Sequence, residues 1–111
     1  MPDCLFCRIV AREIPASIVW ETPTTLAFRD IHPKAPTHVL VIPKEHIASM
    51  AKLDESHSGL IVDLTRAIQD VARLEGALDK GFRVVVNNGK DASQAVPHLH
   101  YHVLAGRKME E

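Results

Sequence analysis

Three histidines alternate with apolar residues near the C-terminal end of the chain, in the run His98-Leu99-His100-Tyr101-His102-Val103-Leu104. In an extended strand successive side chains point to opposite faces. The three imidazoles would therefore form a row on one face, while Leu99, Tyr101 and Val103 pack on the other. A helix, at about 100° per residue, would turn His100 away from both neighbours. The run thus predicts a β-strand with a row of histidines on one face.

A row of imidazoles has three interpretations. The simplest is a set of polar residues on the solvent-exposed face of an antiparallel strand, but three alternating copies of an uncommon residue beside a polar loop argue against it. Three neutral imidazoles with an open fourth position would also hold a catalytic zinc ion. In the third interpretation one neutral imidazole attacks phosphorus while its neighbours bind the phosphate and the leaving group. The spacing alone does not choose between the last two.

The length and the charge of the chain limit what it can be. Its 111 residues are enough for one domain, which we place over residues 1–111. The near balance of 13 basic and 14 acidic residues leaves no positive excess for nucleic acid or an anionic membrane, so we expect neither partner. The sequence shows no signal peptide and no run approaching the ~18 apolar residues of a membrane span. We therefore expect a cytoplasmic protein with a small ligand.

The chain has two cysteines, Cys4 and Cys7, in a Cys-x-x-Cys pair. In a reducing compartment such a pair serves redox chemistry or half of a metal site. A thioredoxin-like redox motif follows a strand, whereas only three residues precede Cys4, so redox use is the weaker interpretation. A zinc site needs two more ligands, which the seven histidines can supply. The pair alone leaves zinc and two free thiols evenly balanced.

The apolar pattern along the chain predicts an α+β domain. A short helix is expected over Leu5–Glu13, and one long helix from an N-cap at Asp54 through Leu74. The expected strands are Ser17–Glu21, Thr25–Arg29, His38–Ile42, Phe82–Val86 and His98–Leu104. This order of elements predicts a roughly five-stranded, mainly antiparallel sheet with one short and one long helix.

Several segments together identify a family. They are the histidine run, Phe6-Cys7, Glu13-Ile14-Pro15, Phe28-Arg29-Asp30-Ile31, Ala35-Pro36-Thr37-His38, Val41-Ile42-Pro43-Lys44 through His46, and Val85-Val86-Asn87-Asn88-Gly89 with Gln94. On these residues the chain resembles the histidine triad (HIT) superfamily over nearly its whole length. The ending Leu104-Ala105-Gly106-Arg107-Lys108-Met109 is most similar to the Hint branch, the purine nucleoside phosphoramidases. The resemblance implies the HIT-like fold and a homodimer with one continuous sheet.

The resemblance also implies an activity. Family members bind a purine nucleoside monophosphate, AMP or GMP, and hydrolyse the bond between its α-phosphate and an amine, acyl or other leaving group. By position, His100 would be the nucleophile, passing through a nucleotidyl-histidine intermediate, and His102 would contact the phosphate and the leaving group. An imidazole with a pKa of about 6.5 is mostly neutral at pH 7 and forms a labile phosphoramidate. No catalytic cofactor is implied.

Further site residues follow from the same resemblance. Phosphate oxygens would be held by Asn87, Gln94 and the backbone of Ser93, Ala95 and Val96. The base and sugar would be walled by Leu5, Phe6, Ile9, Ile14, Phe28 and Ile31, which without the resemblance would be interpreted as ordinary core. Asp30 would accept hydrogen bonds from the ribose hydroxyls, the alternative being a turn or cap carboxylate. His38 would support the histidine row through hydrogen bonds, and a satisfied histidine at a strand start is the alternative.

The resemblance changes the interpretation of the cysteines. Several members carry zinc on a Cys-x-x-Cys pair, a histidine placed like His46, and the first histidine of the row. Cys4, Cys7, His46 and His98 occupy these positions here. The resemblance therefore favours a structural zinc over free thiols. Four protein ligands leave the ion no open position, so it would not be catalytic.

Two departures from the family pattern bear on activity. Where many Hint-like enzymes have Gly-Gln-Ser, this chain has Ser93-Gln94-Ala95, and so it lacks a hydroxyl that assists the leaving group. The chain also ends at Glu111, without the longer tail that in relatives reaches the partner subunit's site. The main alternative to hydrolysis is a nucleotide-binding adaptor that acts through a protein partner. A metal hydrolase built on the three histidines is the third possibility.

Overall fold

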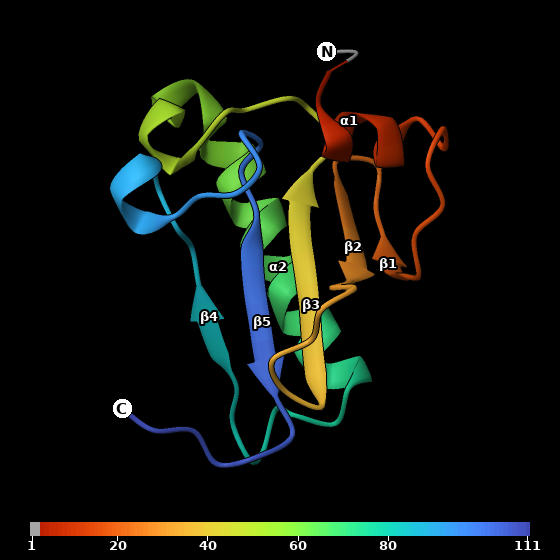
Figure 1. The fold of residues 1–111 in the computed structure, drawn as a ribbon, viewed down its shortest axis with the longest axis vertical. Coiled ribbons are helices and arrows are strands. Elements are labelled where there is room, and N and C mark those ends of the chain that lie inside the picture. The colour runs from red at the N-terminus through yellow and green to blue at the C-terminus, as the bar shows by residue number, and fades with distance from the viewer. Residues whose placement is uncertain (1–2) are drawn as a thin grey trace.

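A computed structural model describes residues 3–111, which form a five-stranded sheet with a helix on each face (Figure 1). The strands are β1 (Ile18–Glu21), β2 (Thr25–Arg29), β3 (Thr37–Pro43), β4 (Arg83–Val85) and β5 (Tyr101–Ala105). They lie in the order β1-β2-β3-β5-β4, and every neighbouring pair is antiparallel. The helices are α1 (Leu5–Val10) and α2 (Ser58–Leu74), with short 3-10 turns at Met50–Lys52, Glu55–His57 and Lys90–Ala92. The α+β fold predicted from the sequence is confirmed.

The central strand β3 is buried along its whole length. Val39 and Val41 belong to the apolar cluster under α2, whereas Leu40 and Ile42 belong to the cluster that includes α1. A strand covered on both faces needs apolar residues at successive positions. This explains why the sequence here is a continuous apolar run, unlike the alternating run of histidines.

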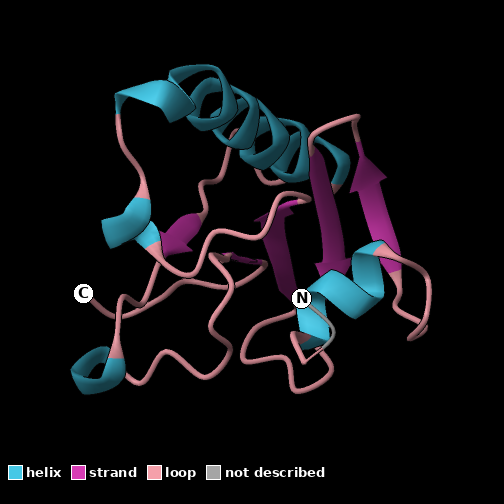
Figure 2. Ribbon diagram, turned by 90° about the horizontal axis from the view of Figure 1, so that it is seen from above, coloured by secondary structure: helices cyan, strands magenta, loops and turns pink. Residues whose placement is uncertain are grey.

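The long helix α2 covers one face of the sheet, opposite α1 (Figure 2). Its buried residues Leu64, Ala67 and Val71 recur at spacings of three and four, as an amphipathic helix requires. The predicted cap Asp54 is present, and its carboxylate accepts from the Ser56 N–H at 2.9 Å. It caps the preceding 3-10 turn, however, so the α-helix itself begins at Ser58. No helix within residues 3–111 is long and apolar enough to cross a membrane.

The short helix α1 ends at Val10, before the predicted end at Glu13. It stops because Arg12 takes a left-handed backbone conformation, with φ 64°. The Glu13 N–H donates to the Arg8 carbonyl at 2.9 Å, and the Arg12 N–H donates to the Ile9 carbonyl at 3.0 Å. These two bonds are those of a Schellman motif, which satisfies the last carbonyls of a helix.

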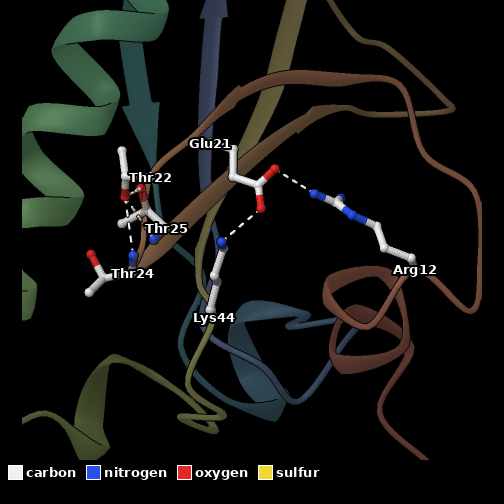
Figure 3. A network of polar contacts seen from close by, with 6 residues as sticks. All are labelled: Arg12, Glu21, Thr22, Thr24, Thr25 and Lys44. Carbon is white, nitrogen blue, oxygen red and sulfur yellow. Dashed lines mark hydrogen bonds and ion pairs between the residues drawn. The ribbon is translucent and has the colours of Figure 1, made fainter.

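The chain that follows α1 is tied to the sheet by the carboxylate of Glu21, at the end of β1 (Figure 3). Glu21 pairs with Arg12 on one side and with Lys44 on the other, where the Lys44 Nζ to Oε2 distance is 2.7 Å. Lys44 and then Arg12 lower the pKa of Glu21, so the carboxylate stays charged. In the adjoining hairpin turn, the Thr25 N–H donates to the Thr22 hydroxyl at 3.0 Å.

The strand that carries the histidines begins later than the sequence predicts. The predicted strand starts at His98, whereas β5 starts at Tyr101. The His98 N–H donates to the Val96 carbonyl at 2.8 Å in a tight turn, and the Leu99 N–H donates to the carbonyl of Ile47 at 2.7 Å. These bonds lie outside the sheet ladder, so residues 98–100 lead into β5 without being part of it.

Candidate functional site

The three imidazoles lie in a row on the α1 side of the sheet, as the alternation predicts. The Phe6 ring of α1 meets His98 and His100 edge to face, at centroid distances of 5.9 and 5.1 Å. The His100 and His102 rings are 5.1 Å apart. The residues between them face the other way, because Leu99 is buried in the cluster under α2 and Tyr101 packs against it.

A cavity of about 560 Å³ opens beside His100 and His102, between α1, the sheet and the connection from β2 to β3. Of the residues predicted for the site, this cavity is lined by the wall residues Leu5, Phe6, Ile9, Ile14, Phe28 and Ile31, by the ribose candidate Asp30, and by the phosphate-loop residues Ala95 and Val96. Residues that sequence reasoning missed are Pro15, Ala16, Ser17, Arg29, His32 and Leu40. Among these, only Leu40 could have been found from the sequence, since it lies two residues from His38 on the same face of a strand. The walls are mainly apolar, and their polar side chains are those of Ser17, Arg29, Asp30, His32, His100 and His102.

The hydrogen bond of His100 fixes its tautomer. Its Nδ1 lies 2.8 Å from the carbonyl oxygen of His98, and since a carbonyl only accepts, Nδ1 carries the proton. The lone pair of Nε2 is therefore available on a side chain that lines the cavity. This is the form of imidazole that acts as a nucleophile.

A second chain of hydrogen bonds fixes the tautomers of His38 and His102. The Lys34 backbone N–H donates to His38 Nδ1 at 3.1 Å, so the His38 proton is on Nε2, which donates to His102 Nδ1 at 2.9 Å. Neutral His102 then carries its proton on Nε2, as a donor for the cavity that it lines. Asp30 Oδ2 lies 3.4 Å from His38 Nε2.

Both histidines of this pair are neutral at pH 7. Burial, and then the neighbouring His100 and His38, lowers the pKa of His102 to about 4. Burial likewise lowers the pKa of His38, although Asp30 opposes the shift. The donor and acceptor roles described above therefore hold at neutral pH.

Cys4, Cys7, His46 and His98 bring their ligand atoms within 4.8 Å of one another. Cys4 Sγ lies 3.3 Å from His98 Nδ1, and Cys7 Sγ lies 3.2 Å from His46 Nδ1. Sulfur and nitrogen ligands of a tetrahedral zinc ion are about 3.5 Å apart. His98 also donates its Nε2–H to the Pro43 carbonyl at 2.9 Å, which leaves Nδ1 unprotonated toward the sulfurs. The donor set and its geometry fit zinc.

Three predicted phosphate ligands do not line the cavity. Gln94 has its amide engaged within the loop, because Oε1 accepts from the Gly89 N–H at 2.8 Å and Nε2 donates to the carbonyls of Ala48 and Val96 at 2.8 and 3.0 Å. Ser93 is exposed in a left-handed turn, and Asn87 is half-buried just after β4. The structure thus gives Gln94 the role of closing the loop, while Ala95 and Val96 reach the cavity.

The fold and the site define an α+β protein with a histidine-lined cavity on one face of an antiparallel sheet. The HIT domain family matches residues 11–109, and the chain belongs to this family. An uncharacterised HIT-like protein of Synechococcus elongatus is 45% identical over 107 residues, which cover 96% of this chain and 93% of the relative. A 14 kDa zinc-binding protein of Zea mays is 44% identical over 107 residues, covering 95% of this chain and 83% of that protein. The solved structure of a HIT family hydrolase from Clostridium thermocellum has a TM-score of 0.97 at 43% identity, covering 100% of this chain and 96% of that chain.

Proposed function

We propose that this chain is a purine nucleotide hydrolase of the nucleoside phosphoramidase type, in the Hint branch of the family. It cleaves the bond between the α-phosphate of a nucleoside monophosphate, AMP or GMP, and its leaving group. The observation that carries the proposal is the state of His100. The His98 carbonyl holds the Nδ1–H of His100 at 2.8 Å, and this leaves Nε2 available at a cavity of about 560 Å³.

The reaction follows from these tautomers. The Nε2 lone pair of His100 attacks phosphorus, the bond to the amine breaks, and the amine departs with the electron pair and takes up a proton. The positive charge that develops on the imidazole strengthens the Nδ1–H bond to the His98 carbonyl. His102 donates its Nε2–H to the phosphate or the leaving group. Water then attacks phosphorus, the electron pair returns to Nε2 and a proton is released.

The test is hydrolysis of adenosine 5′-phosphoramidate, with and without excess chelator, by the wild type and by His100→Ala. We expect activity that survives the chelator and falls at least about a thousandfold in the variant. Activity lost to chelator in a protein that stays folded would instead support the metal hydrolase. Binding of AMP without turnover would support the adaptor.

We propose that Cys4, Cys7, His46 and His98 hold a structural zinc ion. Burial, and then the adjacent Cys4, raises the pKa of the Cys7 thiol, and a divalent cation would offset this by binding the thiolate. Zinc bound there supplies a cross-link between the N-terminal segment and the histidine row. Thiol ligands also require a reducing compartment, which is our reason to propose the cytoplasm.

Metal analysis of gently purified protein should find about one zinc per chain, and Cys4→Ser should lower this ratio and the melting temperature.

We also propose a homodimer. The edge strand β4 carries Val84, 42% exposed, and α2 carries Val62 and Leu74, 51% and 54% exposed. An edge strand offers unpaired backbone groups, and a second copy would extend the sheet while covering these apolar side chains. Sedimentation at several concentrations tests this, because Val84→Lys should shift the wild-type dimer toward monomer. A monomeric wild type would contradict it.

A further inference from the structure

The carboxylate of Glu75, at the C-terminal end of α2, holds two other elements at once. Arg29 Nη1 donates to Glu75 Oε1 at 2.7 Å, and Nη2 donates to Oε2 at 3.1 Å. The hydroxyl of Thr37 donates to Oε1 at 3.3 Å. Arg29 is the last residue of β2 and Thr37 is the first of β3, so Glu75 joins both ends of the connecting loop 30–36.

This contact differs from an ordinary surface ion pair. The Glu75 side chain is only 14% exposed, its pairing with Arg29 is bidentate, and its second partner, Thr37, is buried. A carboxylate at a helix C-terminus is also disfavoured by the helix dipole. Arg29 compensates for this, and it lowers the pKa of Glu75 so that the carboxylate stays charged.

The loop held in this way carries much of the candidate site. Asp30, Ile31 and His32 line the cavity, and the Lys34 N–H sets the tautomer of His38. The Asp30 carboxylate is itself oriented by the His32 N–H, which donates to Oδ1 at 2.8 Å. A shift of the loop ends would therefore move the group proposed to bind ribose.

We infer that Glu75 is a positioning residue for the nucleotide site, which acts through Arg29 and Thr37 to place Asp30 against the ribose hydroxyls. Glu75 does not line the cavity, so its influence is indirect. The inference rests on the proposed function, in which Asp30 binds ribose. It adds that the end of α2, on the other side of the sheet, sets the affinity for a nucleotide with an intact ribose.

The test compares Glu75→Gln with Asp70→Asn, a matched control that breaks the exposed α2 ion pair between Asp70 and Arg73. Binding of AMP and of 2′,3′-dideoxy-AMP is measured for the wild type and both variants. Glu75→Gln should weaken AMP binding about tenfold with little change in kcat, and should leave dideoxy-AMP binding unaltered. Asp70→Asn should change neither. The double variant with Arg29→Gln and Glu75→Gln should weaken AMP binding no further than the more severe of the two single variants, because both changes break the same contact.

Equal weakening of AMP and dideoxy-AMP in Glu75→Gln would overturn the inference, as would AMP binding no weaker than that of Asp70→Asn. A wild type that binds both nucleotides equally would refute the ribose contact of the proposed function. In that case, amide hydrogen exchange in the absence of nucleotide tests whether Glu75 holds the loop in place, independently of ribose binding. The Lys34 amide should exchange about tenfold faster in Glu75→Gln than in Asp70→Asn, and equal rates would overturn it.

Discussion

The two faces of the sheet are built for different purposes. The α2 face is an apolar core in which Leu64, Val71 and Val103 are buried among other apolar side chains. The α1 face buries imidazoles beside an open cavity, and each buried imidazole has a specific hydrogen-bond partner, as His100 has in the His98 carbonyl. Apolar packing stabilises the first face, whereas the second depends on hydrogen-bond geometry. Changes on the two faces should therefore separate stability from activity.

The largest effect on stability is expected from Leu64→Ala, in the centre of the α2 face. Leu64 is 2% exposed, and removing its side chain leaves a cavity that the packed sheet cannot fill. We expect a loss of about 3 kcal/mol in the free energy of unfolding, measured in urea. The folded variant should keep the wild-type kcat. A large fall in kcat would show that the two faces are not separate.

Gly106→Ala should disturb the α1 face through the backbone. Gly106 has φ 99°, and a Cβ there would lie 2.7 Å from Cβ of Pro36, at the end of the loop that carries Asp30. We expect a loss of about 2 kcal/mol in unfolding free energy, together with weaker AMP binding. Gly76→Ala is the control, because Gly76 also has a positive φ, but a Cβ there would meet no atom of residues 3–111 within 4 Å. If both substitutions behave alike, contact with Pro36 has no role.

The pH dependence of stability above the titration range of the carboxylates should come from the α1 face. Because the folded pKa of His102 is about 4, the unfolded chain takes up the proton first as the pH falls below about 6.5. Unfolding free energy should therefore decrease between pH 6.5 and 4, by at most about 1.4 kcal/mol per pH unit for this group. His102→Gln should flatten the curve, whereas Leu64→Ala should lower it without changing its slope. An unchanged slope in His102→Gln would contradict the assignment.

The sequence predicted well which side chains of the histidine run lie on which face of the sheet. Alternation around His100 placed the imidazoles opposite Leu99, because side-chain period is a property of the extended backbone itself. The hydrogen bonds and ion pairs of the loops were harder to predict. The engagement of the Gln94 amide depends on where the loop carbonyls lie, and the partners Arg29 and Glu75 are 46 residues apart. Such contacts depend on packing between elements, which local pattern does not encode.

The smallest expected effect concerns Ser93, at the position where the resemblance to Hint-like enzymes implies a glycine. Ser93 is exposed with φ 60° and ψ 42°, a left-handed conformation that costs an L-residue about 1 kcal/mol. Ser93→Gly should therefore raise the unfolding free energy by about 0.5–1 kcal/mol. Part of this gain is offset because glycine has greater backbone freedom in the unfolded chain. Ser93→Ala keeps the strained backbone and should give no gain, so equal urea midpoints for the two variants would remove strain as the cause. The strain lies in the loop that leads to Ala95 and Val96. If Ser93→Gly is more stable and binds AMP with unchanged affinity, relief of backbone strain in this loop does not disturb the hydrogen-bonded groups of the α1 face.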